Sequence, residues 1–251
     1  LEEDLEDVPE AGKRLAAARR SDLDKIEEQG ATLRAVQAYL ASISYADEQL
    51  GRMLDALESS EYNSNTVIVF WSDHGWHLGE KRHWHKSTLW EESTRIPLII
   101  AVPKLKPGVC DQPVSLLDLY PTLLDLCGIS GNQQFDGLSL LPQLRVPKTK
   151  RQPVVIEFRK RNAAVRSARW RYIRYSDDSE ELYDHKTDSY EWENLASKSK
   201  YKMVKQRLAK WLPKNWSEPA LSKNKFEFDP DSYSWKNKKT GKMYFGSNLD
   251  N

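Results

Sequence analysis

Residues 66–102 have the sequence TVIVFWSDHGWHLGEKRHWHKSTLWEESTRIPLIIAV, in which two short apolar runs enclose a polar segment rich in histidine. The first run, 66–71, is continuous and rich in β-branched and aromatic residues, which is typical of a strand buried on both faces. The second run, 96–102, has Pro97 near its beginning, where a strand tolerates proline, and is closed by Pro103. We therefore predict two buried strands that are joined by a long loop.

Helical patterns flank the two predicted strands. Residues 31–59 have apolar side chains at steps of three and four, which predicts a helix with one apolar face. Asp47 occupies a position of this series where an apolar residue is expected, so we predict that a neighbouring loop hydrogen-bonds its carboxylate. Residues 114–127 have a second helical pattern, followed by Gly128, which is placed to end it. The order helix, strand, loop, strand, helix favours an α/β sheet covered by helices.

The pattern changes beyond about residue 152. Short strand-like pieces occur at 153–158, 163–175 and 182–184, and residues 190–212 have the spacing of one amphipathic helix. We predict that residues 151–212 form a small α+β subdomain with an antiparallel sheet and a C-terminal helix.

The two ends of the chain lack a clear period. We interpret the acid-rich residues 1–30 as a connector, and the Lys- and aromatic-rich residues 213–251 as an irregular tail that covers the small subdomain or contacts a glycan. The first residue is Leu1, with no charged-then-apolar leader after it, so we expect the chain to be part of a longer protein.

Composition excludes several classes of protein. The 251 residues include 38 Lys+Arg and 37 Asp+Glu, a net charge of +1, which argues against a nucleic-acid-binding surface. The longest apolar run is far below the ~20 residues of a transmembrane segment. Two cysteines rule out a disulfide scaffold.

The segment 72–95 is where we expect chemistry, because it holds four of the five histidines. Asp73 and His74 follow directly on a predicted buried strand, and sites in open α/β sheets collect at the carboxyl ends of strands. A carboxylate is a natural ligand of a hard divalent cation. Two alternatives remain open: a tight turn without a metal, and a zinc site in which His83 and His85 join His74 or Asp73.

Several side chains near Asp73 and His74 in the sequence are candidates for substrate binding. Lys86 is a compact cation that would hold an anionic group of a substrate, unless it is an ordinary solvated lysine. Trp76 and His85 are candidates for substrate binding, since aromatic faces suit sugar rings, although loop tryptophans also serve as packing anchors. Further candidates are the other ring side chains of the segment, His77, His83 and Trp84.

These residues resemble a known family. Asp73-His74-Gly75-Trp76-x-Leu78-Gly79-Glu80-(x3)-Trp84-x-Lys86 is similar to the second metal-site segment of the sulfatases, and most similar to their iduronate-2-sulfatase-like branch. Arg95-Ile96-Pro97-Leu98-Ile99 and Leu117-Asp118-Leu119-Tyr120-Pro121-Thr122 resemble the strand and helix that follow it. The likeness covers residues 5–212 in order.

The resemblance implies a sulfate-ester hydrolase with an alkaline-phosphatase-like α/β fold, of which residues 31–150 would form the C-terminal part. One divalent cation, usually Ca²⁺, is expected, with Asp73 and His74 matching one pair of its ligands. Lys86 matches a lysine that binds the sulfate group. The implied partner is a sulfated carbohydrate, and the resemblance implies an exported, periplasmic or lysosomal location if a signal peptide precedes these residues.

The family's nucleophile is a formylglycine made from the cysteine of a Cys-x-Pro-Ser-Arg segment, and neither Cys110 nor Cys127 lies in such a segment. We therefore expect a C-terminal half that carries half of the metal site and does not turn over alone. Two alternatives remain: a non-catalytic protein that binds sulfated glycans or a partner, and a phosphodiesterase or phosphatase of the same superfold.

Overall fold

The computed structural model describes residues 4–18, 20–130, 134–217 and 225–245. The chain divides into two compact units, Leu1–Lys214 and Asn215–Asn251, and each is described by itself.

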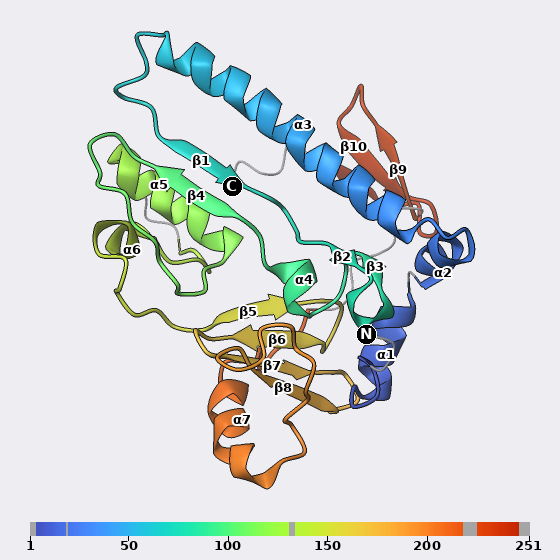
Figure 1. The fold of residues 1–251 in the computed structure, drawn as a ribbon. Helices are drawn as coiled ribbons and strands as arrows, with labels where there is room; N and C mark the ends of the chain where they lie inside the picture. The colour runs from blue at the N-terminus through green and yellow to red at the C-terminus, as the bar shows by residue number, and fades with distance from the viewer. Residues whose placement is uncertain (1–3, 19, 131–133, 218–224, 246–251) are drawn as a thin grey trace. The chain divides into compact units, whose positions relative to one another are not determined.

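The central elements of the first unit are a long helix and a two-stranded ribbon. Helix α3 (Thr32–Glu58) is followed by strand β1 (Ile68–Trp71), which pairs antiparallel with β4 (Leu98–Ala101) so that Trp71 lies opposite Leu98 (Figure 1). After β4 a 3-10 turn leads into α5 (Leu119–Cys127). Helix α5 ends at Gly128, whose φ of 66° lies in the left-handed region that glycine adopts without strain. These elements confirm the helix, strand, loop, strand and helix predicted from the sequence.

The burial predicted for these elements is wrong. No residue of α3 is buried, and Asp47 is exposed rather than held by a loop. Trp71 is 49% exposed and Ile99 is 59% exposed. The physical reason is that β1 pairs only with β4 among the described residues, so both outer edges of this ribbon are open. The apolar patterns of α3 and β1 are those of elements at the centre of a larger α/β layer.

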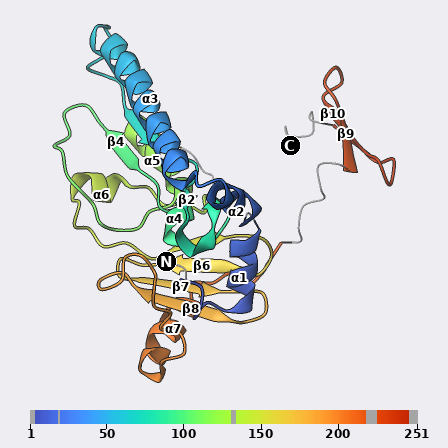
Figure 2. The ribbon, with the colours of Figure 1, turned by 45° about the vertical axis from the view of Figure 1, so that its right-hand side comes forward.

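The small antiparallel sheet is confirmed. Strands β5 (Val154–Glu157), β6 (Ala163–Arg166), β7 (Trp170–Arg174) and β8 (Glu180–Asp184) pair in sequence order, each antiparallel to the next (Figures 1 and 2). The predicted piece 163–175 is thus two strands with a turn between them.

The helix predicted over 190–212 is much shorter. Helix α7 spans Lys202–Ala209 after a 3-10 turn at Ser199–Tyr201. The preceding residues bond to β8 instead: the Leu195 amide donates to the Leu182 carbonyl at 2.8 Å, and the Leu182 amide donates to Asn194 Oδ1 at 3.0 Å. Glu191 has a φ of 60°, which also prevents a regular helix there.

Residues 1–30, expected as a connector, instead contain helices α1 (Glu10–Ala17) and α2 (Arg20–Glu28). Pro9 precedes α1 as its N-cap residue, in an extended conformation. One face of α1 belongs to the core between the sheet and the segment before α4 (Glu91–Thr94). The buried members of this core are Val8, Ala11, Leu15, Ala16, Leu89, Trp90, Ala164, Ile173, Tyr175 and Tyr183.

The second unit is not the irregular tail that the sequence predicted. It contains strands β9 (Phe226–Asp229), β10 (Ser234–Asn237) and β11 (Met243–Phe245), which form a three-stranded antiparallel sheet with β10 in the middle. The alternation Phe-Glu-Phe-Asp in β9 is the strand signal that the sequence analysis missed.

The remaining elements are the two-residue strands β2 (His77–Leu78) and β3 (Trp84–His85), the 3-10 turn Glu80–Arg82 between them, and the short helix α6 (Leu141–Arg145). Among the described residues, no helix combines the length and the apolar character needed to cross a bilayer.

Candidate functional site

The loop that follows β1 is fixed by a close backbone approach. The Gly75 amide donates to the Ser93 carbonyl at 2.8 Å, and a Cβ atom at Gly75 would lie 1.9 Å from the Glu92 carbonyl oxygen. Only glycine fits this contact between the loop and α4. The Ser72 hydroxyl donates to the His74 carbonyl at 2.8 Å, which holds the preceding turn. The sequence Ser-Asp-His-Gly thereby places Asp73 and His74 at the carboxyl end of β1, as predicted.

Asp73 and His74 bring two potential metal-ligand atoms close together. His74 Nδ1 donates to the Gly75 carbonyl at 2.8 Å, so in a neutral ring the lone pair is on Nε2. That Nε2 atom lies 3.6 Å from Asp73 Oδ1, too far for a hydrogen bond. Side chains that ligate one cation have their donor atoms at about this separation, because metal–oxygen bonds to Ca²⁺ are about 2.4 Å long. The Asp73 side chain is 79% exposed, so its other ligand positions are open.

A hairpin returns the chain to this loop. Strands β2 and β3 pair His77 with His85, and Gly79 has a φ of 125° at the turn between them. His85 is therefore brought back beside the start of the loop, and Lys86 follows it with an exposed side chain. Lys86 thus lies on the same small hairpin that follows Asp73 and His74.

Trp76 lies at the centre of a group of rings. Its ring centroid is 4.8 Å from that of His85, 6.1 Å from that of His74 and 5.9 Å from that of Tyr39 in α3. The Trp76 indole Nε1 is buried and has no hydrogen-bond acceptor among the described residues. His85 Nε2 lies 2.9 Å from the carboxylate of Asp22 in α2. Sequence reasoning missed Asp22 because it lies in the predicted connector, whereas Tyr39 belongs to a correctly predicted helix.

His77 and His83 are structural rather than part of a pocket. Both rings are fully buried. His77 Nε2 lies 2.8 Å from the Thr88 hydroxyl, and burial together with the nearby His83 lowers the pKa of His77 to about 3. The two nitrogens of His83 lie 2.8 Å from the Ala16 carbonyl and 3.0 Å from the Lys86 carbonyl. Because both nitrogens are engaged, the geometry does not favour the zinc alternative, which needed His83 as a ligand.

A second group with metal-ligand spacing lies elsewhere in the first unit. Ligand atoms of Glu91, His185 and Glu191 lie within 4.8 Å of one another. Two guanidinium groups already fill this cluster: Arg166 Nε pairs with Glu91 at 3.0 Å, and Arg171 pairs with both Glu91 and Glu191. Burial alone would raise the pKa of Glu91, but the two arginines lower it to about 2. The cluster is therefore a buried ion network that joins α4 to the sheet.

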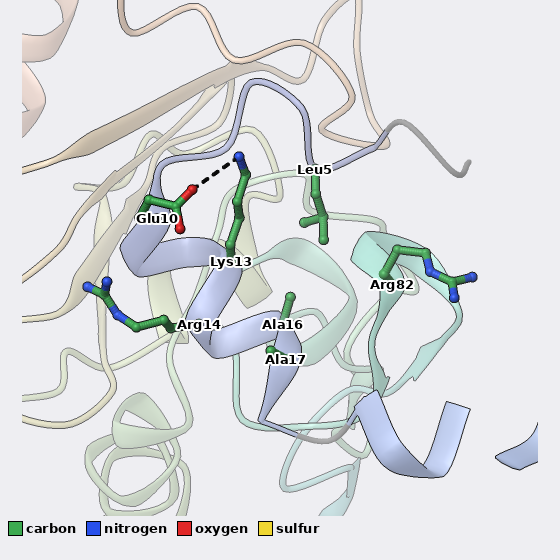
Figure 3. A pocket seen from close by; sticks show the side chains of 7 residues that line it. All are labelled: Leu5, Glu10, Lys13, Arg14, Ala16, Ala17 and Arg82. Atoms are coloured by element: carbon green, nitrogen blue, oxygen red, sulfur yellow. Dashed lines mark ion pairs between the residues drawn. The ribbon is translucent and has the colours of Figure 1, made fainter. Parts of the chain in front are cut away.

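A pocket of about 280 Å³ lies over α1 and Arg82, and Figure 3 shows its lining side chains. Its cations are all paired: Lys13 with Glu10 at 3.4 Å, Arg14 with Asp177 at 3.4 Å, and Arg82 with Glu27 at 2.6 Å. None of the site residues predicted from the sequence lines it, so it is not a candidate for an anion site.

The chain matches two family models. The model described as "Sulfatase" matches residues 7–129, and the model described as "N-sulphoglucosamine sulphohydrolase, C-terminal" matches residues 79–218, which is more than half of the chain.

Relatives and solved structures agree with these matches. A protein of Formosa agariphila named "Sulfatase" is 39% identical over 220 residues, which are 84% of this chain and 42% of that protein. The solved structure of a 2-O GAG sulfatase has a TM-score of 0.70 at 28% identity, over 82% of this chain and 48% of its own. Phosphonate monoester hydrolase of Agrobacterium radiobacter has a TM-score of 0.59 at 26% identity, over 67% of this chain and 38% of its own.

The chain thus spans less than half the length of each of these proteins. The likeness confirms the predicted fold class, a partial alkaline-phosphatase-like α/β layer followed by a small antiparallel sheet and helix. The likeness does not show whether the chain belongs to the iduronate-2-sulfatase-like branch or to another branch of the sulfatases. Together with the geometry at the end of β1, the family matches lead to one conclusion: the chain belongs to the sulfatase family.

Proposed function

We propose that this chain is the C-terminal part of a sulfatase that hydrolyses sulfate esters of glycans, of the iduronate-2-sulfate type. The observation that carries the proposal is the pair of ligand atoms on Asp73 and His74, 3.6 Å apart at the end of β1, with Lys86 on the adjoining hairpin. The open faces of α3, β1 and β4 also support it, since they suit a larger sheet than the described residues form.

In this proposal Asp73 and His74 hold one divalent cation, Ca²⁺, by a carboxylate oxygen and by His74 Nε2. The bond from His74 Nδ1 to the Gly75 carbonyl keeps the ring turned for that role. When bound, the cation would neutralise negative charge on the sulfate oxygens. Two ligands are fewer than the six to eight oxygens typical of Ca²⁺, so other residues must complete the site.

Lys86 binds the sulfate group in this proposal. Its ammonium group would stabilise the non-bridging oxygens as the S–O bond breaks, and its exposure leaves the group free to reach a ligand. The formylglycine nucleophile is expected outside these 251 residues, since neither cysteine lies in its motif.

Trp76 and His85 would bind the sugar next to the sulfate. Their ring centroids lie 4.8 Å apart in an edge-on arrangement, so the two side chains adjoin each other. The likeness to a 2-O GAG sulfatase supports a 2-O-sulfated uronic acid as the substrate.

Two other functions are candidates, and the experiment described below would give a different result for each of them. The likeness to a phosphonate monoester hydrolase favours a phosphoryl or phosphonyl substrate as the second candidate. The third is a glycan-binding protein without turnover.

The test is a chimera in which this chain replaces the homologous part of the Formosa agariphila sulfatase. We expect it to hydrolyse an aryl sulfate and, more efficiently, a 2-O-sulfated iduronate disaccharide. Lys86→Ala should reduce turnover at least ~100-fold, as expected for a group that stabilises developing charge. Lys106→Ala, which removes an exposed lysine outside the hairpin, is the matched control and should leave turnover unchanged.

Hydrolysis of phosphonate esters in place of sulfate esters would move the assignment to the second candidate. An inactive chimera beside an active parent would favour the non-catalytic function. The 251-residue chain alone should show no turnover above that of its own Lys86→Ala variant.

A further inference from the structure

The second unit presents a row of aromatic rings on one face of its sheet. The register places Trp235 of β10 opposite Phe228 of β9 and opposite Tyr244 of β11. Directly opposed residues of antiparallel strands point to the same face, so the three rings lie side by side across all three strands. Phe226 belongs to the same face because it is two residues from Phe228.

These rings contact one another but remain open to solvent. The centroids of Phe228 and Trp235 are 5.0 Å apart, and Tyr233 from the adjoining turn lies 5.3 Å from Trp235. Phe228 is 46% exposed, Tyr233 is 60% exposed and Tyr244 is 42% exposed. Contiguous exposed rings of this kind are unusual on a protein surface and are typical of binding sites.

Lysines gather at one end of this aromatic face. Asn237 holds the β10–β11 turn by accepting from the Lys239 amide at 2.9 Å, and the Lys238 amide donates to the Lys225 carbonyl at 2.6 Å. The Lys242 ammonium lies 5.2 Å from the centre of the Tyr244 ring. Among the residues that the structure describes, no ion pair involves these four lysines.

Acidic side chains lie at the opposite end of the sheet. Asp229 ends β9 and Asp231 lies in the following turn, where Asp229 accepts from the Ser232 hydroxyl and from the Asp231 amide. The unit is therefore polarised along its strands, with positive charge at the β10–β11 turn.

We propose that the face formed by Phe226, Phe228, Tyr233, Trp235 and Tyr244, with Lys225, Lys238, Lys239 and Lys242 at its end, binds a sulfated glycan. Sugar rings stack on aromatic faces, which present a large apolar area at little cost in conformational entropy. Sulfate groups pair with ammonium groups, and the pairing is strongest where no carboxylate competes. The face would hold the polymer whose sulfate esters the first unit helps to cleave, so this inference rests on the proposed function for its choice of ligand.

The experiment measures binding of heparin-derived oligosaccharides to the full 251-residue chain, with the same oligosaccharides after desulfation as the comparison. Hydrogen exchange read by mass spectrometry locates the bound ligand. We expect protection within residues 225–245, and affinity at least ~10-fold lower for the desulfated sugar.

Two kinds of variant test the two parts of the face. Tyr244→Ala removes an exposed ring, and Tyr233→Asn removes another at a φ of 46°, a conformation that asparagine tolerates. Lys238→Gln with Lys242→Gln removes charge. Each should weaken binding at least ~10-fold, whereas Tyr62→Ala and Lys106→Gln, at exposed positions of the first unit, should not.

Several outcomes overturn the inference: unchanged affinity in Tyr233→Asn, weaker binding in the lysine variant only, no protection within 225–245, or equal affinity for single-stranded DNA, which would indicate a general polyanion surface. Loss of slow hydrogen exchange at the β10–β11 turn in Tyr244→Ala would mean that this substitution unfolds the sheet. In that case the affinity of Tyr233→Asn decides whether the aromatic face binds the glycan. Lys86→Ala should leave the protection of residues 225–245 unchanged while it abolishes turnover in the chimera, so failure here is distinguishable from failure of the sulfatase proposal.

Discussion

His74 Nε2 and Asp73 Oδ1 lie 3.6 Å apart, and the other nitrogen of the same ring is committed to a backbone carbonyl. With its proton on Nδ1, a neutral imidazole has its lone pair on Nε2, the nitrogen near the Asp73 carboxylate. A cation bound by both side chains would offset the negative charge of that carboxylate. This relationship makes the pair a candidate for metal binding on chemical grounds that are separate from any likeness to other proteins.

The first prediction concerns this pair. Tb³⁺, which takes the oxygen-rich sites of Ca²⁺, should bind the chain weakly and luminesce on excitation of Trp76, whose ring centroid is 6.1 Å from that of His74. Asp73→Asn should abolish most of the sensitised emission. Asp111→Asn, at an exposed aspartate elsewhere, is the matched control. Equal emission from the two variants would contradict a cation site at Asp73.

The second prediction concerns the close approach at Gly75. Gly75→Ala places a methyl group against the Glu92 carbonyl oxygen, so α4 or the loop must move. We expect a loss of at least ~2 kcal/mol in the free energy of unfolding, measured with urea. Gly51→Ala, in the middle of α3 with nothing within 4 Å, should instead stabilise the chain by ~1 kcal/mol. Similar effects of both variants would mean that the loop does not contact α4 as described.

The third prediction concerns the buried ion network. Glu91→Gln removes the carboxylate that Arg166 and Arg171 share, so both guanidinium groups lose this negatively charged partner. We expect unfolding to become easier by about 3–5 kcal/mol, the usual cost of breaking a buried pair. Asp178→Asn, which removes the exposed partner of Arg161, should cost less than ~0.5 kcal/mol. A small effect of Glu91→Gln would show that water reaches the network.

The fourth prediction is a pH dependence at Glu92. Burial, reinforced by the nearby Glu191, raises the pKa of Glu92 from 4.5 to about 8 in the folded chain. Between these values the folded chain holds a proton that the unfolded chain has lost, so this group reduces stability as pH rises toward 8. Glu92→Gln should therefore be more stable than the native chain at pH 8–9 by at least ~1.4 kcal/mol, the worth of one pKa unit. The two should be equally stable near pH 4.5.

Urea titrations at both pH values check this result. Glu61→Gln, at an exposed glutamate, should show no such dependence on pH. An advantage of Glu92→Gln that persists at pH 4.5 would indicate a packing effect and not a titration.

Elements whose signal lies within a short stretch of sequence could be predicted from the sequence alone. The apolar spacing of α3, the β-branched run of β1 and the glycine that ends α5 predict those elements correctly, because each signal lies within the element itself. Asp73 and His74 were placed at the end of a strand for the same reason.

The features that were missed depend on partners distant in sequence. Lys81 is 1% exposed and pairs with Asp4 at 2.7 Å, which no local pattern of charged residues indicates. The helix predicted from residue 190 was wrong because Leu195 bonds to β8 instead of to its own turn. In the sequence His83 was a possible zinc ligand and His77 a candidate for the substrate pocket, yet their partners are a hydroxyl and carbonyl oxygens.

The open edges of the β1–β4 ribbon have a practical consequence. Each outer edge offers a row of backbone donors and acceptors to any other strand, and Trp71 and Ile99 add exposed apolar surface beside them. We expect preparations of these 251 residues to self-associate as they are concentrated, by strand addition from one molecule to the next. Light scattering against concentration is therefore the first measurement to make on the purified chain, and suppression of the scattering by a strand-forming peptide would show that the open edges mediate the association.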